Sequence, residues 1–153
     1  MASLIPGNPT PIGEHTWRVL GRNPGMMTGP GTNSYLYGRD ALTVIDPGPV
    51  DQEHLKALLA AARELGKPIN QVIVTHTHRD HSPGALAIVA ATGARCLGPF
   101  VPDDGLQDET WQADQVLREG DVVDCGGVGL SVIETPGHVN NHLCYLTDEG
   151  LLF

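Results

Sequence analysis

Near the middle of the chain, an apolar run leads directly into a group of histidines and reads Gln71-Val72-Ile73-Val74-Thr75-His76-Thr77-His78-Arg79-Asp80-His81. The apolar residues 72–74 are typical of a short strand that is buried on both faces, as in a parallel sheet. Ligands and reacting groups of such sheets gather beyond the carboxyl ends of the strands. We therefore predict that the chemistry of this chain lies just after the strand at 71–75.

Helices are predicted on both sides of this strand. The first covers 55–65, where apolar residues recur with a helical period between an N-capping Asp51 and a terminating Gly66. The second is expected to begin at Ser82-Pro83 and to end at Gly93. Strands are expected at 17–20, 34–37, 41–45, 95–97, 121–125, 128–134, 142–146 and 151–153. This order of elements indicates one α/β sandwich domain that takes in residues 1–153.

The composition limits the kinds of partner. The 153 residues carry 9 Lys and Arg against 18 Asp and Glu, so the net charge of −9 lacks the basic footprint of a protein that binds duplex nucleic acid. No run of about 18 apolar residues is present, so no membrane span is expected. The N-terminus has neither the basic nor the apolar part of a secretory signal, and the 3 cysteines are an odd number. A reducing, cytoplasmic location is therefore expected.

The first histidine group has the residue types and the spacing of a metal site. His76 and His78 are two residues apart in an extended segment, so their side chains point the same way. Asp80 and His81 follow where the chain turns toward a helix, and they can approach the same pocket from another side. Imidazole and carboxylate are ligands that zinc and iron accept. The competing interpretation is a solvated loop, which so dense a cluster disfavours.

A second group, Thr135-Pro136-Gly137-His138, follows the apolar strand at 128–134. His138 would complete a three-histidine zinc site with one position open for water. For His142, the sequence leaves open whether it touches metal or only makes a hydrogen bond nearby. For Asp46, it leaves open a turn-starting role and a role as the carboxylate that holds the N–H of a metal-bound histidine.

The other histidines and the cysteines are assigned no chemistry. His15 and His54 are expected at the surface, and His54 falls in the first turn of a helix. The cysteines are expected to be core residues, as free cysteines usually are. They are Cys96, Cys125 and Cys144.

These motifs resemble those of a known family. Residues 75–81 look like the His-x-His-x-Asp-His signature of the metallo-β-lactamase superfamily, residues 135–138 look like its third motif, and residues 45–48 look like its first. The stretch 27–36 is similar to bacterial hydrolases related to the mitochondrial β-lactamase-like endoribonuclease. The resemblance covers about residues 17–153. It implies the N-terminal part of an αββα sandwich whose second lobe is incomplete.

The resemblance implies a zinc-dependent hydrolase. The metal ligands that it implies are His76, His78 and His138 for a first zinc, and Asp80 and His81 for a second. Asp46 would support the first cluster from behind. A zinc-bound hydroxide would attack an ester-type or phosphodiester bond, and Asp80 would be the catalytic residue that orients the water. Manganese and iron also suit such mixed sites.

In the family, two further ligands come from the part that would follow residue 153, so the chain resembles the N-terminal half of a longer hydrolase. Its second metal site would keep only two protein ligands. The substrate would be a small molecule or single-stranded RNA. The alternative is a non-catalytic zinc-binding fragment or association module, which self-associates through an exposed strand at 151–153. A redox protein with a di-iron site is a third hypothesis.

Overall fold

Two sheets and two helices make up residues 4–153, the part of the chain that the computed structural model describes. The larger sheet has seven strands in the order β1 (Thr10–Pro11), β2 (Thr16–Leu20), β3 (Asn33–Tyr37), β4 (Leu42–Ile45), β5 (Ile69–Ile73), β6 (Arg95–Gly98) and β7 (Gln115–Val116). The smaller sheet has the order β10 (Leu143–Thr147), β9 (Gly129–Glu134) and β8 (Val122–Asp124). The prediction of an α/β fold is confirmed.

The strand directions follow from the connections between strands. Strands β1 to β4 are antiparallel, whereas β4 to β7 run parallel. Short turns join β1 to β2 and β3 to β4, and the longer loop 21–32 joins β2 to β3. Helix α1 (Gln52–Glu64) crosses from β4 to β5, and α2 (Ala85–Thr92) crosses from β5 to β6. Within residues 4–153, no helix is both long enough and apolar enough to cross a membrane.

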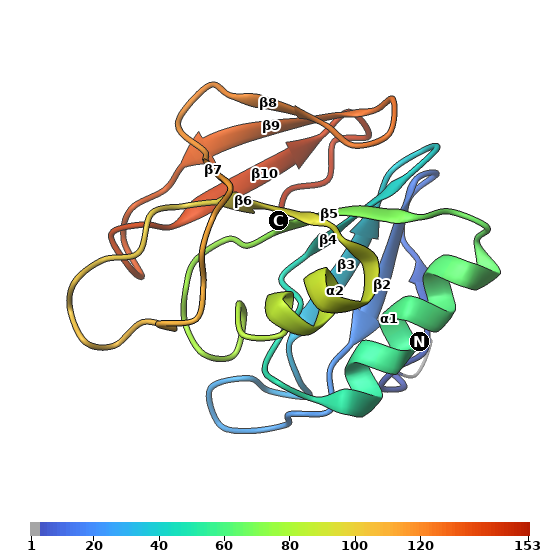
Figure 1. The fold of residues 1–153 in the computed structure, drawn as a ribbon, viewed down its shortest axis with the longest axis horizontal. Helices are drawn as coiled ribbons and strands as arrows, with labels where there is room; N and C mark the ends of the chain where they lie inside the picture. The colour runs from blue at the N-terminus through green and yellow to red at the C-terminus, as the bar shows by residue number, and fades with distance from the viewer. Residues whose placement is uncertain (1–3) are drawn as a thin grey trace.

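The elements form three layers, with both helices on one face of the larger sheet and the smaller sheet on its other face (Figure 1). Successive residues of the central strands therefore belong to different cores. Val72 packs in the cluster that contains Leu58 of α1, whereas Ile73 packs in the cluster that contains Leu130 of β9. This two-sided burial explains why the predicted strand is continuously apolar.

The predicted caps of α1 are confirmed. Asp51 Oδ1 accepts hydrogen bonds from the backbone N–H groups of Glu53 and His54, at 2.9 and 3.3 Å. Gly66, directly after the C-cap Leu65, has the positive φ of 66° that suits a glycine. The prediction that His54 lies at the surface was wrong: its side chain faces β3 and it is 1 % exposed.

The predicted start of α2 was wrong by two residues. The helix begins at Ala85 after an N-cap Gly84, and the Ser82 hydroxyl donates to Asp108 Oδ2 (2.6 Å) instead of capping. Gly84 packs against the loop after β4, where a Cβ atom would lie 2.8 Å from the Pro47 carbonyl oxygen. The close contact fixes the segment before α2 against this loop, which local sequence could not reveal.

Residues 151–153 pair with β10. The N–H and carbonyl groups of Phe153 and Tyr145 form two reciprocal hydrogen bonds of 2.9 Å. The predicted segment at 151–153 therefore lies at the edge of the smaller sheet, and the side chain of Leu152 within it is exposed. Self-association through this segment stays a prediction. Cys96 and Cys125 are buried as predicted, while Cys144 is half-buried.

Candidate metal centre

The histidine-rich segment leaves the sheet at the carboxyl end of β5, as predicted. Thr75 and His76 are buried directly beyond this strand, and His78 is half-buried. The second motif follows β9, whose end lies beside the end of β5 because the Leu143 N–H of β10 donates to the Thr75 carbonyl oxygen (2.8 Å). Two loops that are far apart in the sequence thus meet at one place.

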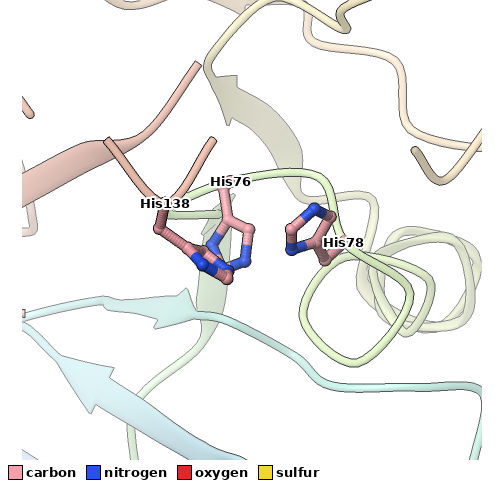
Figure 2. Close-up of side chains that lie close together, drawn as sticks. All are labelled: His76, His78 and His138. Atoms are coloured by element: carbon pink, nitrogen blue, oxygen red, sulfur yellow. The ribbon is translucent and has the colours of Figure 1, made fainter. Parts of the chain in front are cut away.

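Three histidines converge between these loops. Each of His76, His78 and His138 offers one ring nitrogen, and these nitrogens all lie within 4.8 Å of one another. The ring centroids are 4.7 to 5.1 Å apart, and all three pairs meet edge to face. Figure 2 shows the imidazoles grouped together, with His138 reaching in from a different loop. This is the three-histidine group that the sequence predicted.

The buried nitrogen of His76 fits a metal ligand. Thr75 Oγ1 lies 2.8 Å from Asp46 Oδ2 and 3.0 Å from His76 Nδ1. The single hydroxyl proton of Thr75 goes to the carboxylate, so Nδ1 of His76 must carry its own proton and donate to the hydroxyl oxygen. The lone pair of His76 is then on Nε2, which is buried and has no hydrogen-bond partner among the described residues.

The electrostatics also favour neutral imidazoles. Burial lowers the pKa of His76 to about 2, with a further contribution from the neighbouring histidines. Burial and then His138 lower the pKa of His78 in the same direction. Neutral imidazole is the form that binds metal. A group with three such nitrogens and an open side is suited to a zinc ion.

Asp80 and His81 lie beside this group rather than within it. His81 Nε2 is 3.4 Å from Asp80 Oδ2, and the ring centroid of His81 is 4.2 Å from that of His76. Burial disfavours a charged His81, but the hydrogen bond and the charge of Asp46, together with Asp80, outweigh it and raise the pKa of His81. Their role as ligands of a second metal ion stays a prediction.

Asp46 occupies a turn and its carboxylate also lies against a histidine ring, while a role toward a metal-bound histidine stays a prediction. It stands at the turn after β4 with a φ of 51°, and its carboxylate is buried. Oδ1 accepts from the Thr75 N–H (2.7 Å), and Oδ2 lies 2.9 Å from His81 Nδ1. One carboxylate therefore holds His81 directly and His76 through the Thr75 hydroxyl.

His142 and His15 lie outside the three-histidine group. The ring of His142 stacks on His76 at a centroid distance of 5.1 Å, and its Nδ1 lies 2.9 Å from Thr135 Oγ1. Burial lowers the pKa of His142 as well. His15 is half-buried near Glu14, in the turn before β2.

Sequence reasoning missed a buried network around Thr77, which stands between two of the converging histidines. Thr77 Oγ1 donates to Gln107 Oε1 (2.6 Å) and accepts from Asn141 Nδ2 (2.9 Å). The Thr77 carbonyl oxygen accepts from the Asp108 N–H at 2.7 Å. All four residues are buried, yet they lie in loops with no periodic pattern, so no sequence signal pointed to them.

A cavity of about 570 Å³ opens beside the imidazoles. His78, His81 and His138 contribute to its wall, and so does Asp80. Apolar groups come from Met27 and Pro49, and Arg79 contributes a positive charge. The cavity wall therefore combines imidazole, carboxylate, guanidinium and apolar groups.

The chain is similar to several named proteins. It is 34 % identical to an atrochrysone carboxyl ACP thioesterase from Aspergillus fumigatus, over 86 % of this chain and 41 % of that protein. It is 38 % identical to a hydroxyacylglutathione hydrolase from Methylobacterium nodulans, over 63 % of this chain and 36 % of that protein. The chain spans about two fifths of the length of the curated relatives it matches.

The fold is similar to that of solved metallo-β-lactamases. A metallo-β-lactamase structure from Novosphingobium pentaromativorans superposes with a TM-score of 0.72 at 25 % identity, over 97 % of this chain and 60 % of that one. The relatives named here are not endoribonucleases, so the resemblance to that branch gains no support from them. The family model described as "Metallo-beta-lactamase superfamily" matches residues 27–152, and it includes every histidine of the centre. The chain belongs to the metallo-β-lactamase superfamily.

Proposed function

We propose that this chain carries the first metal site of a zinc-dependent hydrolase that cleaves thioesters. The observation that supports the metal site is the convergence of His76, His78 and His138, with the Nε2 lone pair of His76 buried and unused. Zinc bound by these residues would supply a Lewis acid and would lower the pKa of a bound water to about 7. Manganese or iron would suit the same donor set.

The residues of the chain would perform the remaining tasks. The Asp46 carboxylate and the Thr75 hydroxyl fix the tautomer of His76, so that its free nitrogen faces the other two imidazoles. Asp80 lies at the cavity wall with a side chain that is 37 % exposed. In the proposed reaction this carboxylate orients the attacking water toward the carbonyl carbon and accepts its proton. The carbon–oxygen bond forms, the carbon–sulfur bond breaks, and the proton held by Asp80 passes to the leaving thiolate, so that a carboxylic acid and a thiol are released. His81 beside it would hold a second ion together with Asp80.

The choice of a thioester rests on two supports. Relatives of this chain are named as ACP thioesterases, and this supports thioester cleavage as the reaction. The cavity offers Met27 and Pro49 to an apolar acyl group and Arg79 to an anionic carrier. A net charge of −9 does not favour a long polyanion such as RNA. Cleavage of a phosphodiester in single-stranded RNA is the alternative reaction.

Metal content per chain tests the proposal first. We expect about one zinc per wild-type chain, lost in His78→Ala and kept in His15→Ala, because His15 lies away from the cluster. Each protein is then assayed, with zinc and with a chelator, on a short acyl thioester and on single-stranded RNA. A chain that binds no zinc, or zinc retained in His78→Ala, would refute the metal site. Cleavage of RNA alone would refute the thioester assignment.

A non-catalytic zinc-binding or association module is the second candidate, because Leu152, in the segment that pairs with β10, presents an exposed apolar side chain. It predicts bound zinc, no turnover of either substrate, and self-association through residues 151–153. Sedimentation of the chain over a wide concentration range measures that association. A monomer at all concentrations would count against an association module.

A further inference from the structure

A buried pair of side chains lies behind the candidate centre, in contact with neither the converging imidazoles nor the cavity. His54 stands in the first turn of α1 and Ser34 in β3, and His54 Nε2 lies 2.8 Å from Ser34 Oγ. The N-cap of α1 fixes the position of His54, because Asp51 accepts a hydrogen bond from its backbone N–H. The pair also reaches a third residue, Asp46.

The direction of each hydrogen bond follows from the available protons. Ser34 Oγ lies 2.5 Å from the Asp46 carbonyl oxygen, which can only accept. The single hydroxyl proton of Ser34 is used there, so His54 Nε2 must donate to the Ser34 oxygen. His54 is then a neutral imidazole whose Nδ1 is buried without a partner among the described residues. Burial lowers the pKa of His54, which agrees with the neutral form.

Asp46, whose carbonyl oxygen accepts the Ser34 hydrogen bond, has an unusual backbone conformation. Asp46 is the one non-glycine residue of residues 4–153 with a positive φ, at 51°. Such a conformation is unfavourable for a residue with a side chain and persists only where its surroundings hold it. The Asp46 N–H donates to the Ile73 carbonyl oxygen (2.9 Å), and its carbonyl oxygen accepts from Ser34.

We infer that His54 and Ser34 are positioning residues for Asp46. They hold the carbonyl group of Asp46 and so keep its peptide in the left-handed conformation. This conformation aims the carboxylate at the Thr75 N–H, 2.7 Å away, and at the His81 ring. The consequence for zinc binding rests on the function proposed above, whereas the consequence for the Thr75 hydrogen bond requires no metal.

Amide hydrogen exchange of the metal-free chain tests this inference, with the Thr75 N–H as the probe. In His54→Leu we expect this amide to exchange at least about tenfold faster relative to the amides within β5. In His54→Gln the ratio should stay within about threefold of wild type, because a glutamine amide can donate to Ser34. The matched control is Leu58→Ala, one turn along α1 and equally buried, which should speed exchange of Thr75 and β5 alike.

The inference is wrong if Thr75 in His54→Leu exchanges in step with β5, as in the Leu58→Ala control. If His54→Leu does not fold, Ser34→Ala removes the hydrogen bonds to Asp46 and His54 with a smaller change in volume. The exchange rate of the Thr75 amide relative to the β5 amides is then measured in that variant. Zinc titration is the second readout: affinity should fall about tenfold in His54→Leu and return in His54→Gln. A wild-type chain that binds no zinc refutes the proposed function, and the exchange ratio still judges this inference.

Discussion

Replacing Asp46 by asparagine should destabilise the chain by about 3 kcal/mol, although the two side chains have nearly the same shape. The buried carboxylate meets three hydrogens: the N–H and O–H of Thr75 and the Nδ1–H of His81. An asparagine has one acceptor oxygen. In its better orientation this oxygen keeps the two bonds made by Oδ2, while the amide nitrogen faces the Thr75 N–H as donor against donor.

The magnitude follows from these contacts. One buried N–H left without an acceptor costs about 1–3 kcal/mol. The two retained bonds lose the charge of their acceptor and weaken by about 0.5–1 kcal/mol each. The total of about 3 kcal/mol is roughly a hundredfold change in the unfolding equilibrium. With a slope near 2 kcal/mol/M, it lowers the urea midpoint by about 1.5 M.

Urea unfolding of the metal-free chain measures this loss. Asp80→Asn is the matched control, because Asp80 is partly exposed and its contact with His81 is a 3.4 Å ion pair, which is worth at most about 0.5 kcal/mol. If Asp46→Asn unfolds within about 1 kcal/mol of wild type, or no earlier than the control, then Asp46 does not organise the centre. Zinc affinity of the folded variant should also fall by about 10- to 100-fold.

Three more predictions follow from the same geometry. Burial lowers the pKa of His76 to about 2, so below pH 6.5 the unfolded chain binds a proton that the folded chain does not. Acidification from pH 7.5 to 5.5 should therefore cost about 1.4 kcal/mol from His76. His54, His78 and His142, whose pKa values burial also lowers, add to this loss, His81 partly offsets it, and urea midpoints across this range measure the sum. Met27→Ser should raise KM for an apolar acyl thioester about tenfold, while Met26→Ser, outside the cavity wall, leaves steady-state kinetics unchanged. Thr77→Val should cost about 1–3 kcal/mol in urea unfolding, because Gln107 and Asn141 lose a buried partner.

Local patterns predicted the elements well. The caps of α1 and the strand before the histidines depend on neighbouring residues, so the sequence shows both, although β5 covers Ile69–Ile73 and not the predicted 71–75. The three-histidine group was also predictable, because each histidine follows a strand and the carboxyl ends of strands meet. His54 was placed wrongly because helical position alone does not say which neighbour its side chain faces. A buried Ser34 hydroxyl without hydrogen-bond partners would be costly. Only the tertiary structure shows that it donates to the Asp46 carbonyl oxygen and accepts from His54.

The histidine pattern alone does not show which ring nitrogen is free to bind metal. A ring nitrogen can bind metal only if its proton is on the other nitrogen, and a partner must fix that choice. For His76 the partner is the adjacent Thr75, but Thr75 acts correctly only because Asp46, 29 residues earlier, takes its proton. His76 donates to the Thr75 hydroxyl because that hydroxyl in turn donates to the negatively charged carboxylate of Asp46. The histidine pattern therefore indicates where a metal can bind, while the carboxylate that follows a neighbouring strand decides which nitrogen is free to bind it.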